Sequence, residues 1–148
     1  MPLFLLEFNI NLHLNLEPPM SHSPLRHLLS LIAGDPESNT GIRFDLHLFG
    51  RDFLLLISGG EAHLGALAAS DRAELIEHQF SGHQELKITA QAYKELAPLI
   101  RNEIMILCGI HYNNITPEQI SEIQEHAEAL IRQMTEELPA LKVDFEFE

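Results

Sequence analysis

Three short stretches of the sequence combine glycine with histidine and other polar side chains, each between two expected elements of secondary structure. They are Gly59–Gly65, Gly82–Glu85 and Gly109–Asn114. Glycine lacks a Cβ, so another group can approach its backbone closely, and an imidazole can bind a metal ion, a proton or a polar ligand. We expect the three stretches to meet in one binding site. Its candidate residues are Gly59, Gly60, Glu61, His63, Gly65, Gly82, His83, Glu85, Gly109, His111, Asn113 and Asn114.

The residues alone leave three interpretations of these histidines open. In the first, histidines and backbone amides hold a polar organic ligand. In the second, the protein is a small metal-dependent enzyme that uses His63, His83 and His111, with Glu61 or Glu85 completing the set of ligands. In the third, each imidazole bonds a turn carbonyl and binds nothing else. The spacing matches no known pair of metal ligands, so we assign no metal site.

A catalytic nucleophile is not indicated anywhere in the sequence. Cys108, the one cysteine, lies in an apolar run that favours a buried and inert thiol. The sequence contains no Gly-x-Ser-x-Gly pattern, and no glycine pattern of the Walker or dinucleotide type. We therefore predict no catalytic residue.

The second and third stretches lead into expected helices, and helix N-termini attract anionic groups. Cations are scarce beside the three stretches, because only Arg72 and Lys87 lie close to them in sequence. An anionic ligand group is therefore expected to rely on backbone amides and histidine more than on lysine or arginine.

The elements that must position these residues begin with a strand. Apolar and polar residues alternate from Phe4 to Leu16, which is typical of a strand with one wet face. Ser23 and Pro24 then resemble the start of a short helix over residues 23–32 that Gly34 would cap. Two further strands are expected over residues 42–48 and 53–57, joined by a tight turn, with the second strand ended by the glycine pair.

The second half of the chain predicts two long helices. After a strand that ends near Ser70, residues 73–80 form another strand or an irregular segment, and residues 82–101 follow a helical pattern that Pro98 shortens. A strand over residues 103–108 ends at Gly109. A capping box at Thr116 starts the last helix, whose apolar stripe includes Ile120, Ile123, Ala127, Leu130, Ile131 and Met134. Residues 141–147 alternate like a final strand.

Together these elements predict a single α+β domain over residues 1–148, with a largely antiparallel sheet and both long helices on one face. The formal net charge of −13 argues against binding to nucleic acid or to an anionic membrane surface. The sequence contains no apolar run long enough to span a membrane and no basic leader, so we expect a cytoplasmic protein.

At the three glycine–histidine stretches the sequence resembles the prenylated-flavin chaperone domain, the small D-type subunit associated with gallate-type hydroxyarylic acid decarboxylases. The resemblance covers about residues 42–134. It departs from the family where Gln84 replaces an expected lysine and Asn113 replaces an expected aspartate. The lost lysine is a cation that could meet a flavin phosphate.

This resemblance implies a non-catalytic accessory protein. Such a subunit binds prenylated FMN and helps to load or protect the cofactor for a large flavin-dependent decarboxylase subunit that performs the chemistry. The resemblance carries the twelve candidate residues over as cofactor-binding residues, and it leaves a homodimer open.

Overall fold

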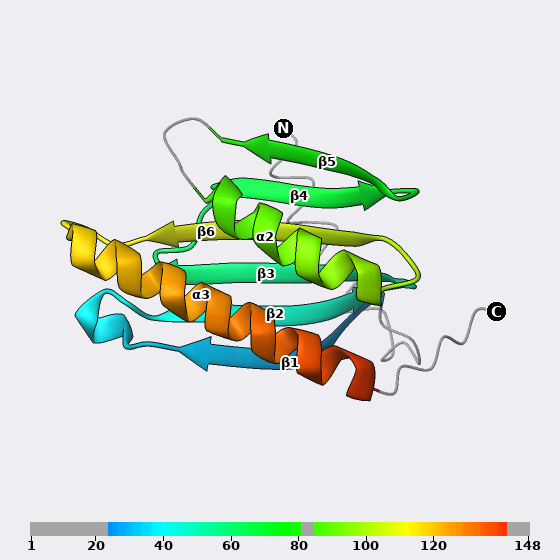
Figure 1. Cartoon of the computed structure of the whole chain (residues 1–148), viewed down its shortest axis with the longest axis horizontal. Coiled ribbons are helices and arrows are strands. Elements are labelled where there is room, and N and C mark those ends of the chain that lie inside the picture. The colour runs from blue at the N-terminus through cyan, green and yellow to red at the C-terminus, as the bar shows by residue number, and fades with distance from the viewer. Residues whose placement is uncertain (1–23, 81–84, 142–148) are drawn as a thin grey trace, which may run out of the picture.

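The computed structural model describes residues 24–80 and 85–141, which form one α+β domain. A six-stranded sheet in the order β1-β2-β3-β6-β4-β5 is covered on one face by helices α2 and α3 (Figure 1). The strands are β1 Leu25–Ala33, β2 Ile42–Phe49, β3 Asp52–Gly60, β4 Ala66–Asp71, β5 Glu74–Gln79 and β6 Ile104–His111. The helices are α2 Leu86–Leu96 and α3 Pro117–Glu137, with short 3-10 helices at Pro36–Ser38, Ala97–Leu99 and Leu138–Ala140.

Strand β6 lies between β3 and β4, so two strands that are consecutive in sequence are separated in the sheet. Its pairing with β3 is parallel, whereas the other strand pairings in the described ranges are antiparallel. This arrangement confirms the predicted largely antiparallel sheet with both long helices on one face.

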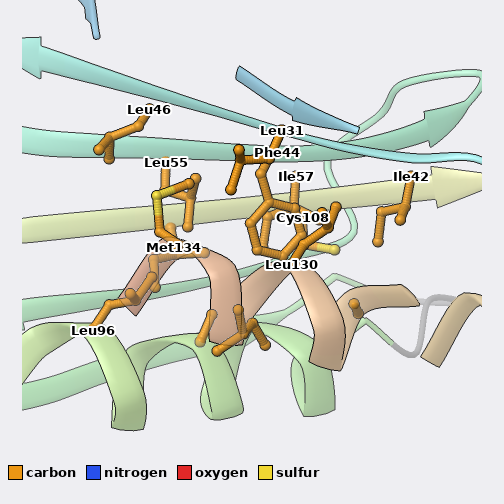
Figure 2. Close-up of a cluster of buried hydrophobic side chains, with 14 of the residues drawn as sticks. Leu31, Ile42, Phe44, Leu46, Leu55, Ile57, Leu96, Cys108, Leu130 and Met134 are labelled. Carbon is orange, nitrogen blue, oxygen red and sulfur yellow. The ribbon is translucent and has the colours of Figure 1, made fainter. Parts of the chain in front are cut away.

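The core lies between the sheet and the helices. Phe44, Leu55 and Ile106, from three neighbouring strands, are completely buried. Leu130 and Met134 of α3 pack against them, and Figure 2 shows these helix side chains directed at the sheet. The alternation of β2 and the apolar stripe of α3 therefore face each other, as the sequence pattern predicts.

The short helix expected over residues 23–32 is wrong, because Leu25–Ala33 is the edge strand β1, paired with β2 along its length. A β-bulge between His27 and Leu29 shifts the alternation by one residue. Apolar residues also stand on the outer face, where Leu25 and Ile32 are 46% and 62% exposed, so the apolar positions of both faces together imitate the periodicity of a helix. Gly34, with a φ of 75°, therefore follows a strand and does not cap a helix.

Other boundaries also differ from the expectation. Strand β6 does not end at Gly109 but continues to His111, and β3 includes both glycines of its pair. Residues 74–79 are a strand, β5. Helix α2 ends at Leu96 and gives way to a 3-10 helix that contains Pro98, as the missing amide proton of proline predicts.

The capping box at Thr116 is confirmed. Its hydroxyl accepts a hydrogen bond from the Gln119 amide, and the Gln119 side chain accepts one from the Thr116 amide. The strand expected from Phe4 to Leu16, the residues Gly82 and His83, and residues 142–147 of the expected final strand lie outside the described residues. Among the helices that the structure does describe, none has the length and apolar character needed to cross a membrane.

Candidate functional site

The first and third glycine–histidine stretches meet at the carboxyl ends of the parallel strands β3 and β6. Gly60 pairs with His111 at these ends, and the Glu61 amide donates a hydrogen bond of 2.9 Å to the His111 carbonyl. The chain then crosses the end of β6 to reach β4. Both α2 and α3 begin at this same edge of the sheet, which is the edge formed by the carboxyl ends of β3 and β6 (Figure 1).

His63 connects the first stretch to the second. Its Nε2 atom lies 3.3 Å from Oε1 of Glu85, which directly precedes α2 and is only 8% exposed. Its Nδ1 atom lies 3.3 Å from the Glu61 carbonyl, so part of its bonding serves its own turn. The described residue of the second stretch, Glu85, therefore belongs to the same cluster as His63.

His111 stands beside His63, with ring centroids 6.0 Å apart and the rings nearly perpendicular. Its Nε2 atom lies 3.1 Å from Oδ1 of Asn113. Asn114 takes a φ of 56° and turns the chain towards α3. The exposed side chains of His111 and Asn113 thus offer imidazole and amide atoms that can donate or accept hydrogen bonds.

The glycines of the site allow the chain to pack against itself. A Cβ on Gly109 would overlap the backbone of His63, and a Cβ on Gly65 would overlap the Glu85 carboxylate. Gly60 combines a φ of 65° with close contact to the His111 carbonyl and the Tyr112 ring. These contacts fix the loop that carries His63 against the end of β6.

Two of the predicted site residues, Gly82 and His83, lie outside the described ranges, so their place in the site stays a prediction. The metal-dependent alternative needs His83 together with His63 and His111. Within residues 24–80 and 85–141, no group of three or more His, Cys, Asp or Glu side chains is placed to hold a metal ion.

A cavity of about 280 Å³ adjoins this edge, and it includes a charged side chain, Arg43, that was not among the candidates from the sequence. Its lining includes Ile32, Pro36, Gly41, Ile42, Arg43, Ser58, Gly59, Gly60 and Tyr112. Arg43 pairs with Ser58, and Ser58 pairs with Gly109, so these three residues form one row across β2, β3 and β6. Arg43 lies far from the glycine–histidine stretches in sequence, and only the strand register reveals its position.

Two side-chain interactions fix residues that line this cavity. The Tyr112 hydroxyl donates a hydrogen bond of 2.6 Å to the Gly41 carbonyl, and burial is the main cause that raises the pKa of this phenol. The Arg43 guanidinium contacts the Asp45 carboxylate, with Nε 2.7 Å from Oδ2. Burial acts to raise the pKa of Asp45, but hydrogen bonds from Arg43 and Ser30 together hold it below its usual value.

Cys108 is buried in the core, as the sequence predicts. Burial, together with the nearby charge of Glu85, raises the pKa of its thiol. A thiol in this environment stays protonated and inert.

A solved structure shares the fold of this chain. It comes from the crystal structure of a novel chaperone complex for yeast 20S proteasome assembly, with a TM-score of 0.53 and 6% sequence identity. The match covers 80% of this chain and 98% of that chain. At this identity the likeness establishes the fold alone. No curated protein matches the sequence.

The family comparison gives a more specific result. A family model described as the prenylated flavin chaperone LpdD-like domain matches residues 36–139, well over half of the chain. This range contains each of the three glycine–histidine stretches on which the resemblance was based, together with Arg43. The chain therefore belongs to the LpdD-like prenylated flavin chaperone family.

Proposed function

We propose that this protein binds prenylated FMN and helps to load or protect it for a partner flavin-dependent decarboxylase. One observation carries the proposal: the described residues of all three stretches converge beside a cavity at one edge of the sheet. Family membership supports the identity of the ligand and the class of the partner.

The donor set fits a flavin. The dioxopyrimidine edge of a flavin ring presents both N–H donors and carbonyl acceptors, and His111 and Asn113 together offer both kinds of atom. The cavity of about 280 Å³ lies just below the usual range of about 300–1,000 Å³ for whole ligand pockets. It is therefore large enough for one end of the cofactor.

A carrier needs polar anchors and a means of release, and it needs no nucleophile. Prenylated FMN supplies the chemistry of decarboxylation when it is bound in the partner enzyme. The residues of this chain bind and orient the cofactor, and their shallow, partly exposed position is suited to transfer. The metal-dependent alternative is tested by metal analysis of the same purified protein and of the His63→Ala variant.

The first prediction concerns cofactor binding. We expect the full-length protein to bind prenylated FMN and FMN, as measured by flavin fluorescence and calorimetry. The His111→Ala variant should bind about tenfold more weakly, because losing one hydrogen bond to the ligand costs about 1.4 kcal/mol.

The matched control is His78→Ala, which removes an exposed histidine on the edge strand β5. This variant should bind both flavins as the wild type does. A wild-type protein that binds neither flavin would refute the proposed function.

A further inference from the structure

We propose that Arg43 binds the phosphate of the flavin mononucleotide, in the cavity beside the histidines. This assignment rests on the proposed function and specifies which end of the cofactor each part of the site recognises. It supplies a cation at a site where cations are scarce in the nearby sequence.

The strand register brings Arg43 to the site. Arg43 of β2 lies opposite Ser58 of β3, and Ser58 lies opposite Gly109 of β6. The backbone of His63 packs against Gly109. Two strand spacings, roughly 10 Å, therefore separate Arg43 from the strand that ends in His111. A flavin mononucleotide is long enough to place its phosphate at one position and its ring at the other.

The guanidinium of Arg43 is held in place and still has donors to offer. Its Nε group hydrogen-bonds both oxygens of Asp45, at 2.9 and 2.7 Å, and one terminal nitrogen lies 3.4 Å from the Ser30 hydroxyl. Arginine carries five N–H donors, so most of them remain available within the described part of the chain. The side chain is 52% exposed, and Arg43 lines the cavity together with Ser58.

Carboxylates lie near both ends of the site: the cavity end has Asp45 and also Asp35, whose charge acts on Tyr112, and Arg43 is a cation among them. Asp45 and Arg43 form a pair without net charge at neutral pH, because a guanidinium stays protonated. The histidine end contains Glu85, 3.3 Å from His63, and the nearby Glu61. A phosphate dianion is repelled by these carboxylates, whereas a neutral flavin ring is not.

The test compares each flavin with its dephosphorylated form, so FMN is measured against riboflavin, and prenylated FMN against the phosphatase-treated compound. The wild type should bind the phosphorylated form at least about tenfold more tightly. Arg43→Gln should abolish this preference and leave the affinity for riboflavin unchanged. Arg43→Lys should retain part of it, because lysine keeps the charge but loses the planar fork of donors.

The matched control is Arg101→Gln, which changes an exposed arginine beside a separate cavity of about 350 Å³ that Lys94 also lines. This variant should keep the wild-type preference. Ser58→Ala provides a second test that leaves the Arg43–Asp45 pair intact, and it should weaken FMN binding without affecting riboflavin. Thermal melts of each variant verify that the fold is retained.

Two results would overturn the assignment while leaving the proposed function standing. The first is an equal loss of FMN and riboflavin affinity in Arg43→Gln, which would indicate a structural role. The second is an unchanged preference in Arg43→Gln. If His111→Gln then loses the preference, the phosphate lies at the histidines. If the wild type binds neither form of either flavin, the proposed function fails, and this assignment fails with it.

Discussion

Gly109 and Gly65 are glycines because another part of the same chain lies against them. The backbone of His63 rests on Gly109, and the Glu85 carboxylate rests on Gly65. Their role is therefore to let His63 and Glu85 lie against the end of β6.

A substitution at Gly109 tests this role. Gly109→Ala should lower the free energy of unfolding by about 1–3 kcal/mol, because the added methyl group forces the loop that carries His63 to move. It should also weaken flavin binding. Urea denaturation and a flavin titration measure the two effects.

The control in the same loop is Leu64→Ala, since Leu64 is 58% exposed and its loss should change stability little. A Gly109→Ala protein that is as stable as the wild type would show that this contact is unimportant.

At this scale the sequence predicts some residues of the candidate site and misses one that we propose. His63, His111 and Glu85 belong to recognisable local patterns, so their candidacy follows from residue type and spacing. Arg43 has no such pattern around it. Its place depends on the pairing of β2 with β3 and of β3 with β6, which involves residues far apart in the chain.

The elements were predictable where one periodicity extends without interruption. Strand β2 alternates cleanly, and α3 combines a capping box with a regular apolar stripe. Strand β1 was misassigned because its bulge breaks the period of two after His27. A bulge depends on the partner strand, so a single segment of sequence does not reveal it.

Leu130 tests the packing of α3. Leu130→Ala should lower the free energy of unfolding by about 2–5 kcal/mol, because its side chain is 2% exposed and packs against the sheet (Figure 2).

The neighbouring variant Glu128→Ala changes an exposed position of the same helix and should alter stability by less than about 0.5 kcal/mol. Denaturation midpoints that fall equally in the two variants would contradict the assigned orientation of the helix.

For the whole molecule, the α+β class and the face covered by the helices follow from the order and patterning of the elements. The position of β6 in the sheet does not follow from that order and patterning. An apolar strand of this kind fits several slots in a sheet, and its insertion between β3 and β4 is decided by contacts with both neighbours.

This insertion predicts a particular order of folding. Ile106, completely buried in β6, lies opposite Leu55 of β3 and Ala68 of β4, so Ile106→Val should slow refolding in stopped-flow experiments. Ile123→Val in α3 should instead act mainly by speeding unfolding. If Ile106→Val leaves the refolding rate unchanged, β6 joins the sheet after the rate-limiting step.

The central position of β6 also matters while the chain is being synthesised. The meander β1–β3 and the hairpin β4–β5 emerge from the ribosome first, and each has one strand, β3 or β4, whose free edge pairs with residues 104–111 in the folded protein. Until that strand arrives, a nascent chain exposes two unpaired strand edges that can capture a neighbouring polypeptide. Pauses in translation before β6 should therefore increase aggregation, whereas pauses after α3 should have little effect.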